Sequence, residues 1–385
     1  MRPLRDLGPL SSAPRSLPAR PGPRGPTIGD LRPWPGVATT IHPVTRREAG
    51  AVSDRQLTEG DLDDLIAAAV RAPSLHNTQP WRFVARPEAI EVHADPSRAL
   101  RVIDPDAREL TLSCGATVFN LRVAAARAKR EPHVQLLPDP EVPTHLATVW
   151  LDRPVLAGAG YAGMYDALWR RRMNRRPFRD AEVPEPRLAE LVEAAKAEGA
   201  ALRFLRRHEL AELLAVAREA DRRQRCDSAY RAELAAWTTD DPWRTDGIHS
   251  STLGPYPQVN FLPVRDFGLT RLDSARRIER FESDPKVAVL ATAGDDRPDW
   301  LRAGQALQRV LVVTAMRGLA ASLFSQPLEL TDLRRAVRDL GGIGAPQMIL
   351  RVGHGRAVLP SARRPVRDVK DLVPRVAPGA QRWRR

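Results

Sequence analysis

Cysteine is scarce in this sequence, and long apolar runs are missing from it. The two cysteines, Cys114 and Cys226, stand far apart and outside any C-x-x-C pair. This spacing argues against a zinc site and against a disulfide framework, and it favours a reduced, cytoplasmic setting. Because the sequence contains no run of about 18 or more apolar residues, we expect no membrane span.

Lysine is also scarce, although the net charge is +13, because only Lys129, Lys196, Lys286 and Lys370 are lysines. A basic chain suggests a nucleic-acid partner. Aromatic residues, however, make up only 5% of the chain, and the arginines are dispersed instead of forming a stripe with aromatics between them. Dispersed charge gives weak, non-specific attraction at most. Alanine and proline are abundant too, as in chains encoded by GC-rich DNA, so we expect no nucleic-acid partner.

The length of 385 residues is enough for two domains. Prolines recur between Pro3 and Pro35, and apolar surface is sparse there, so residues 1–40 are expected to be a disordered Pro/Arg-rich extension. This stretch has no apolar core of the kind found in signal peptides. We assign 41–155 to a first half of the ordered chain, 156–373 to a second half, and 374–385 to a basic tail.

Apolar spacing predicts both helices and strands along the ordered part, which indicates an α+β protein. The expected helices span about 58–70, 109–127, 162–172, 186–198, 208–236 and 301–316, and the expected strands span about 83–84, 90–92, 147–151, 287–293 and 348–352.

Two of these helices resemble each other. The segment C-G-A-T-V-F-N-L-R-V-A-A-A begins at Cys114, and A-G-Q-A-L-Q-R-V-L-V-V-T-A begins at Ala303. Both are apolar on nearly every face, so both are expected to be buried. Glycine in a helix costs about 1 kcal/mol relative to alanine, so Gly115 and Gly304 are expected to permit close packing or the approach of a ligand. The alternative is that both are ordinary alanine-rich core helices.

The segment A-P-S-L-H-N-T-Q-P-W-R-F, Ala72 to Phe83, lies between a helix and a strand. Pro73 and Pro80 make its backbone rigid and leave the amides between them free for other partners. Ser74, Asn77 and Gln79 add short polar groups. Such a loop suits a planar ring with a polar edge, such as isoalloxazine. The alternative is a proline-bounded turn with Asn77 in a left-handed conformation and no ligand.

Two arginine-rich segments could hold a phosphate. In R-R-R-M-N-R-R-P-F, Arg170 to Phe178, Arg172 and Arg176 would face the same way if the segment is helical, and Asn174 can add a neutral donor. The segment P-S-A-R-R-P, Pro360 to Pro365, contributes two more arginines. The alternatives are a solvated basic turn and a basic exit loop.

Taken together, these segments resemble the nitroreductase superfamily of FMN proteins. The stretch P-S-L-H-N-T-Q-P-W resembles the family's P-S-x-x-N-x-Q-P-W signature, R-M-N-R-R-P-F its R-x-S-x-[RK]-x-F opening, and L-P-S-A-R-R-P its closing phosphate segment. Asn174 replaces the usual serine. The resemblance implies that FMN contacts Pro73, Ser74, Leu75, His76, Asn77, Gln79, Arg172, Asn174, Arg176 and Arg363, with Arg364 as the register alternative to Arg363. A structural role for His76 is the alternative there.

The first half carries the ring-covering loop, and the second half carries the opening and closing segments. This order resembles the Acg family of fused nitroreductase-like proteins. It implies an α+β nitroreductase-like fold in which two diverged halves form an intramolecular pseudo-dimer. A single monomeric chain would then build one FMN site.

The resemblance implies NAD(P)H-dependent reduction of a small nitro compound or quinone through FMN. It requires no catalytic side chain, and no metal cluster is present in the sequence. The turn-rich stretch from Trp237 to Gln258 is a candidate lid. The alternative function is therefore an FMN-sequestering protein in which this lid closes over the flavin.

Overall fold

The computed structural model describes residues 56–154, 161–258, 265 and 276–371. All of them belong to one compact unit. The expected extension over 1–40 and the basic tail over 374–385 lie outside the described residues.

The first sheet has the strand order β13-β1-β2-β4-β3. Its strands are β1 (Trp81–Arg86), β2 (Ala89–Ala94), β3 (Arg130–Leu136), β4 (His145–Pro154) and β13 (Lys370–Asp371). Neighbouring strands are antiparallel except for β13, which runs parallel to β1. Helices α1 (Glu59–Ala69) and α2 (Arg108–Arg127) pack on one face. Thr58 and Asp61 form a capping box at the start of α1.

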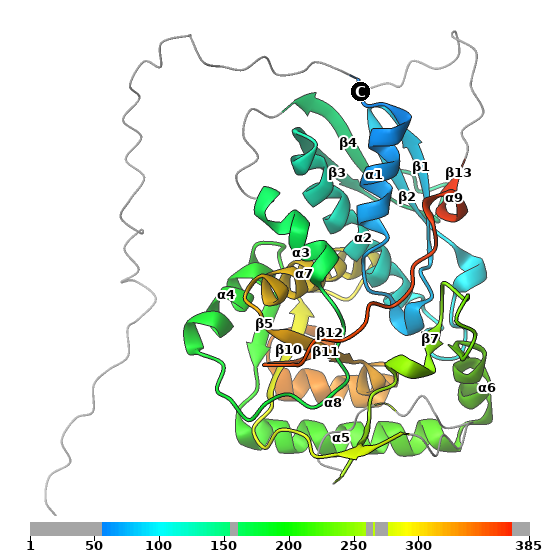
Figure 1. Ribbon diagram of the computed structural model, residues 1–385. Helices are drawn as coiled ribbons and strands as arrows, with labels where there is room; N and C mark the ends of the chain where they lie inside the picture. Colours follow the sequence, from blue (N-terminus) through cyan, green and yellow to red (C-terminus); the bar gives the residue numbers. More distant parts are fainter. Residues whose placement is uncertain (1–55, 155–160, 259–264, 266–275, 372–385) are drawn as a thin grey trace, which may run out of the picture. The chain divides into compact units, whose positions relative to one another are not determined.

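The second sheet is antiparallel, with the strand order β11-β12-β10-β5. Its strands are β5 (Ala201–Phe204), β10 (Lys286–Thr292), β11 (Ala320–Phe324) and β12 (Ala345–Gly353). Both faces are covered, because Ala288 and Leu290 pack with α7 (Arg297–Met316) and α4 (Glu185–Lys196), while Val287 and Val289 pack with α5 (Arg207–Cys226) and α8 (Thr331–Gly341). Figure 1 shows α2 and α7 between the two sheets.

Helices α2 and α7 cross at their glycines. A methyl group on Gly304 would lie 2.0 Å from the carbonyl oxygen of Leu112 and 2.8 Å from the Cα of Gly115. One on Gly115 would lie 2.3 Å from the carbonyl oxygen of Leu301. Both distances are far below van der Waals contact, so only glycine permits this approach. The prediction that the two glycines permit close packing is confirmed.

The C-terminal segment joins the two parts of the fold. After β12 it leaves the second sheet, passes the loop that follows α1, and ends in α9 (Val366–Val369) and β13, which pairs with β1 of the first sheet (Figure 1). Residues distant in sequence therefore meet beside the Ala72–Phe83 loop.

Some elements differ from the sequence-based expectation. The helix expected over 208–236 is broken at Asp227, whose side chain caps a separate helix, α6 (Ser228–Ala236). The helix expected over 162–172 is a 3₁₀ turn (Ala162–Met164) followed by α3 (Tyr165–Arg170). The sequence patterns did not predict β3, β5, β11 or α8.

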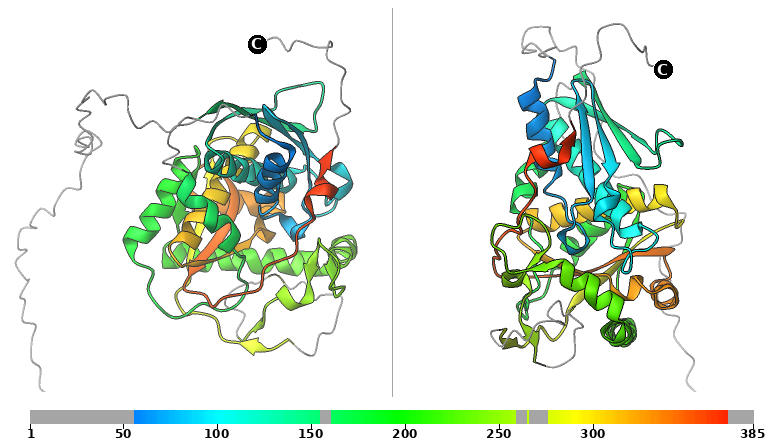
Figure 2. Two further views of the ribbon diagram at one scale, coloured as in Figure 1. Left: turned by 45° about the horizontal axis from the view of Figure 1, so that its top comes forward. Right: turned by 90° about the vertical axis from the view of Figure 1, so that its right-hand side faces the viewer.

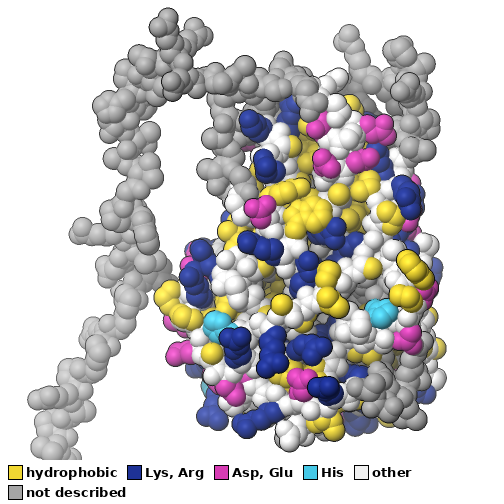
Figure 3. All heavy atoms as spheres, in the orientation of Figure 1, with side chains coloured by type: hydrophobic (Ala, Val, Ile, Leu, Met, Phe, Trp, Pro, Cys, Tyr) yellow, Lys and Arg dark blue, Asp and Glu magenta, His cyan; other side chains and the backbone are white. Residues whose placement is uncertain are grey.

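The stretch from Trp237 to Gln258 contains short strands and turns, namely β6 (Thr238–Thr239), β7 (Ile248–His249), a 3₁₀ turn (Ser250–Thr252) and β8 (Tyr256–Pro257), which pairs with β9 (Ile278–Glu279). No helix in the described part of the chain is long and apolar enough to cross a bilayer. Arginine and lysine side chains are spread over the face shown in Figure 3, among acidic and apolar ones.

Candidate functional site

A cavity lies where the loop after α1 faces the second sheet. The loop contributes Pro73, Ser74, Leu75 and His76. The other lining residues come from α2 and α7, from the segment after α3, and from β11 and β12 and the residue that follows β11; Arg265 lies outside these elements. They are Glu109, Leu112, Ser113, Met173, Arg175, Arg265, Leu307, Ser322, Leu323, Phe324, Ser325, Met348 and Arg351. Four of the residues predicted to contact the cofactor therefore line one cavity with residues of the second half.

The loop has a constrained backbone. His76, Asn77 and Gln79 all have positive φ, at 50°, 55° and 51°. This left-handed region is uncommon for residues other than glycine, and such strain gathers at binding sites. The hydroxyl of Ser74 accepts a hydrogen bond from the amide of Gln79 at 2.9 Å, and the hydroxyl of Thr78 donates to the carbonyl of Leu75 at 2.9 Å. These bonds hold the loop in a fixed conformation.

His76 is buried, and its Nε2 lies 2.7 Å from Nη1 of Arg265. Burial first, and then the charges of Arg265 and Arg175, keep the pKa of His76 well below its ordinary value. A neutral imidazole accepts the hydrogen bond that the Arg265 guanidinium donates. The same guanidinium forms an ion pair with Glu329, so this wall of the cavity is internally neutralised.

Asn77 and Gln79 lie beside the cavity and are absent from its lining. Asn77 Nδ2 donates to the carbonyl of Gly247 at 3.1 Å, and its Oδ1 accepts from Nη1 of Arg363 at 2.9 Å. Gln79 Nε2 donates to the carbonyl of Thr245 at 2.8 Å, and its Oε1 accepts from the amide of Arg364 at 2.8 Å. Both amides therefore join the loop to the 245–247 turn and the C-terminal segment, and their contact with a flavin stays a prediction.

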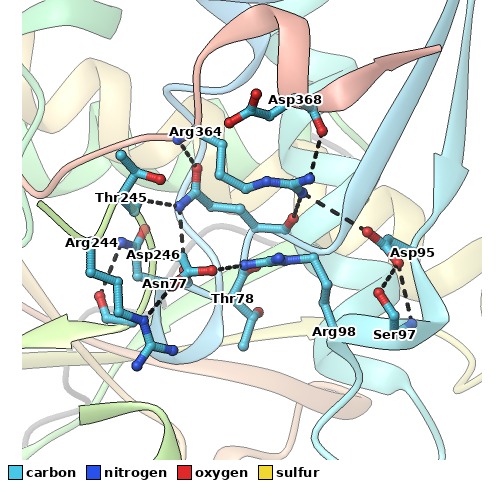
Figure 4. Close-up of polar contacts among 12 residues, drawn as sticks. Asn77, Thr78, Asp95, Ser97, Arg98, Arg244, Thr245, Asp246, Arg364 and Asp368 are labelled. Carbon is cyan, nitrogen blue, oxygen red and sulfur yellow. Dashed lines mark hydrogen bonds and ion pairs between the residues drawn. The ribbon is translucent and has the colours of Figure 1, made fainter. Parts of the chain in front are cut away.

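Figure 4 shows polar contacts between the loop, the 245–247 turn and the C-terminal segment, with Arg98 beside them. Arg98 points toward Asp246 and forms an ion pair with it. Arg98 Nε also donates to the carbonyl of Thr78 at 2.5 Å. The 245–247 turn of the candidate lid is thus held against the loop by the ion pair of Asp246 with Arg98 and by the hydrogen bonds of Asn77 and Gln79. The amide of Gly247 also donates to the carbonyl of Asn77 at 3.2 Å.

Arg71, Arg171, Arg172 and Arg363 form an arginine cluster behind the loop. Arg363 donates to the carbonyls of Val70 at 2.9 Å and Ala72 at 3.1 Å. Burial, followed by the charges of Arg171, Arg71 and Arg172, lowers the pKa of Arg363 to about 9. Burial and the neighbouring arginines likewise lower the pKa of Arg171 to about 10.

Several donors of the arginine cluster lack partners among the described residues. They are Nε of Arg71 and Nε and Nη1 of Arg171, all of them buried. A buried guanidinium donor without an acceptor is costly. An anion of high charge would satisfy these donors and relieve the repulsion between the four positive charges.

The segment after α3 corrects one expectation. Helix α3 ends at Arg170, and Met173 forms a parallel bridge with Ala321, so the backbone here is not helical. Arg172 and Arg176 therefore do not share a helix face. Met173 and Arg175 line the cavity, whereas Arg172 and Asn174 border a second cavity with Arg356.

The remaining predicted phosphate ligands have partners of other kinds. Asn174 is buried, and its Nδ2 donates to the carbonyl of Arg356 at 2.8 Å. Arg176 is half exposed and lies 3.9 Å from Glu279. Contacts of Asn174 and Arg176 with a phosphate stay predictions.

Arg175, Arg351 and Glu109 line the cavity but were not predicted. Arg175 Nη1 donates to the carbonyl of Thr252 at 3.0 Å, and burial, with the charge of Arg265, lowers its pKa to about 10. Arg351 interrupts the apolar strand M-I-L-R-V, a pattern that could have marked it, and it forms a buried ion pair with Glu282 at 2.8 Å. Burial, the largest cause, raises the pKa of Glu109 to about 7.

The cavity and the arginine cluster suit the two ends of an FMN, although no member of the cluster lines this cavity, and Arg171 and Arg172 border the second one. The cavity has apolar walls, formed by Leu75, Leu112, Leu307, Leu323 and Met348. Four hydroxyl groups lie among them, those of Ser74, Ser113, Ser322 and Ser325. Apolar walls with a few polar groups suit a planar ring with a polar edge. The unsatisfied guanidinium donors of the arginine cluster suit a phosphate.

Known proteins match this chain along most of its length. The family model described as "Nitroreductase family" matches residues 46–154. The Mycobacterium tuberculosis protein named "Putative NAD(P)H nitroreductase acg" is 34% identical over 304 residues, which are 78% of this chain and 91% of that protein. A second M. tuberculosis protein, whose name also begins "Putative NAD(P)H nitroreductase", is 34% identical over 291 residues, which are 75% of this chain and 83% of that protein.

A solved structure resembles the chain more distantly. It is the FMN and NADPH-dependent nitroreductase NfnB from sphigopyxis sp. strain HMH, which is 16% identical. Its TM-score is 0.36, and the match covers 55% of this chain and 99% of that one. This likeness is too weak to bear on details of the fold or the site.

Proposed function

This chain belongs to the nitroreductase family, and we propose that it binds one FMN and uses NAD(P)H to reduce nitro compounds or quinones through it. One observation carries the proposal: a single cavity is lined by the family's loop signature, Pro73–His76, and by strands of the second half of the chain. The names of the two M. tuberculosis relatives support the activity.

Each part of the chain would hold a different part of the cofactor. Pro73, Ser74 and Leu75 would lie against the ring, with the end of β11 on the opposite wall. Arg172 and Arg363 would bind the phosphate, with Arg71 and Arg171 supplying the unsatisfied donors. FMN, when bound, supplies the hydride chemistry, so the protein needs to supply only position, charge and exclusion of water.

We infer that the two halves form an intramolecular pseudo-dimer. Each half has its own sheet and a long buried helix, and the two helices meet at Gly115 and Gly304. The C-terminal segment crosses from the second sheet to the first. The ring loop comes from one half and the opposite wall of the cavity from the other, which accounts for a single site.

A second candidate function is FMN sequestration, and contacts of the candidate lid favour it. The 245–247 turn is bonded to Asn77 and Gln79, and Arg98 pairs with Asp246. Leu253 packs in an apolar cluster with Leu75, a residue of the cavity wall. A lid held this closely would limit the access of NAD(P)H and substrate to the ring.

The two functions are separated by one experiment. Purified yellow protein is mixed with NADPH in the absence of oxygen, and the visible absorbance of FMN is followed. Bleaching that a nitroaromatic or a quinone reverses supports the reductase. Colour that persists while FMN stays bound supports sequestration. A colourless protein that does not take up added FMN contradicts both.

A further inference from the structure

The outer face of the first sheet carries a cluster of two histidines and a glutamate. In β2, Ile90 and Val92 are fully buried against the helices. Side chains alternate along a strand, so Glu91 and His93 project from the opposite face. The strand sequence A-I-E-V-H-A thus places both polar groups on the side away from α1 and α2; the right view of Figure 2 shows α1 on one side of this sheet.

The sheet register adds the third member of the cluster. His145, at the start of β4, is the cross-strand partner of His93, next to a register shift between Val92 and His93. The two imidazole rings are stacked, with centroids 4.4 Å apart and planes inclined by 17°. The backbone pairing of β2 with β4 therefore places the two rings beside each other.

The potential ligand atoms are close together, and Nε2 of His145 also lies 2.9 Å from the hydroxyl of Thr148. One ligand atom from each of Glu91, His93 and His145 lies within 4.8 Å of the other two. His93 Nε2 is 3.0 Å from Oε2 of Glu91, and the two side chains are 19% and 16% exposed. Arg86 pairs with the other carboxylate oxygen of Glu91 and so orients the carboxylate. Oε2 is thereby directed toward the imidazole.

We propose that Glu91, His93 and His145 bind a divalent transition metal, with Zn²⁺ as the reference ion. Imidazole nitrogen and carboxylate oxygen are the ligands that Zn²⁺ takes at about 2.0–2.2 Å, commonly in tetrahedral geometry. Ligand atoms in such a site are roughly 3.5 Å apart, so small rotamer changes bring the three atoms together. Water would complete the coordination, and Arg86 would act as an outer partner that fixes the carboxylate.

This metal site is independent of the proposed flavin site. None of its three ligands lines the cavity at the Pro73–His76 loop. The metal would cross-link β2 to β4, two strands that already pair, so its expected effect is stabilisation of the first sheet. Its presence or absence leaves the assignment of the flavin cavity unchanged.

The test measures metal binding by the full-length, FMN-loaded protein after treatment with a chelator and its removal. Isothermal titration calorimetry is expected to show that one equivalent of Zn²⁺ binds tightly. Addition of Co²⁺ is expected to produce, in the difference spectrum, the visible absorption bands of a protein-ligated cobalt ion. The variants His93→Gln, His145→Gln and Glu91→Gln are each expected to weaken Zn²⁺ binding by tenfold or more. FMN colour should survive chelation in all of them.

The matched control is His133→Gln, which changes an exposed histidine of β3 in the same sheet. It should bind Zn²⁺ like the unaltered protein. The proposal is overturned if no stoichiometric binding is found, or if the His93→Gln/His145→Gln double variant binds Zn²⁺ as tightly as the unaltered chain. Far-UV circular dichroism of each variant shows that its fold is intact.

Discussion

Arg172 and Arg363 contribute to the arginine cluster in different ways. Arg363 also supports the loop, because it binds the carbonyls of Val70 and Ala72 and the side chain of Asn77. Within the described part of the chain, the Arg172 side chain donates to carbonyls of its own segment, those of Trp169 and Arg171. A substitution at Arg172 therefore tests the phosphate assignment with little disturbance of the loop.

We predict that Arg172→Ala weakens FMN binding by roughly 10- to 150-fold, the range that corresponds to a charge-assisted bond of about 1.5–3 kcal/mol. Adding Arg363→Ala should abolish stable binding. Fluorescence titration with FMN and with riboflavin measures the effect, since riboflavin lacks the phosphate. If Arg172→Ala lowers the affinity for both ligands equally, or for neither, its role as a phosphate ligand is wrong. Arg302→Ala, at a half-exposed arginine of α7, is the control.

Glu109 gives the cavity a group with a strongly altered pKa. Burial raises this pKa from 4.5 to about 7 against the opposing charge of the paired Arg108, so the folded protein favours the neutral carboxyl below about pH 7. The contribution of this carboxyl to the free energy of unfolding is fully present below its unfolded-state pKa of about 4.5, and it is lost as the pH rises to about 7. A shift of this size corresponds to about 3 kcal/mol.

We predict that the free energy of unfolding of the unaltered protein falls by up to about 3 kcal/mol relative to that of Glu109→Gln between pH 5 and pH 8. Taking the difference between the two proteins removes the contribution of His76, whose lowered pKa acts in the opposite direction. Urea unfolding at a series of pH values measures it. The control Glu193→Gln, at an exposed position of α4, retains Glu109 and should follow a pH curve parallel to that of the unaltered protein. Parallel pH curves for the unaltered protein and Glu109→Gln would contradict the shift.

At the scale of elements, the crossing of α2 and α7 depends on two glycines. A methyl group on Gly304 would lie 2.0 Å from the backbone of α2, and backbone cannot yield as a flexible side chain can. Gly304→Ala is predicted to lower the free energy of unfolding by about 1–3 kcal/mol or more, as overpacking in a core does. Thermal or urea unfolding measures the loss.

The matched control for this prediction is Gly60→Ala. Gly60 also lies in a helix, but the nearest atom to an added methyl group is 3.9 Å away. Alanine should therefore stabilise α1 by up to about 1 kcal/mol through helix propensity. The packing argument fails if the two substitutions shift the stability in the same direction.

Local patterns predicted the elements with strong periodicity or a cap. Helices α1, α2 and α7 are such cases, with the Thr58 capping box and the nearly continuous apolar stretches after Gly115 and Gly304. Strand β3 was missed because Pro132 and alternating charges interrupt a short segment, and β11 because it is only five residues long and begins with the small residues Ala320, Ala321 and Ser322. Pairing with β4 and β12 stabilises these strands, and a local window does not contain that information.

The residues of the candidate site also divide into those that a local sequence pattern predicts and those that only the fold brings together. The loop residues Pro73 to His76 were predicted, because the signature is contiguous. Arg175 was missed because the side that it faces is set by the bridge between Met173 and Ala321, residues that are distant in sequence. Arg71 and Arg171 were missed as members of the arginine cluster for the same reason, since the fold of the loop brings them to Arg363.

At the scale of the molecule, one chain supplies both walls of the cavity. The loop after α1 faces the ends of β11 and β12, while Arg363 reaches the same loop from the C-terminal segment. A site built within one chain forms at any protein concentration, whereas a site between subunits requires that the subunits first associate. The occupancy of the proposed flavin site would then depend on the concentration of FMN alone.

We predict that the monomeric chain binds one FMN and that this stoichiometry stays constant when the protein is diluted at fixed free FMN. Size-exclusion chromatography with light scattering and flavin absorbance measures mass and occupancy together. Loss of FMN on dilution in step with dissociation of a dimer would show that two chains build the site. Two FMN per chain would show that each half retains a complete site. Either result contradicts the pseudo-dimer, in which the two halves of one chain are both necessary and together sufficient to hold one flavin.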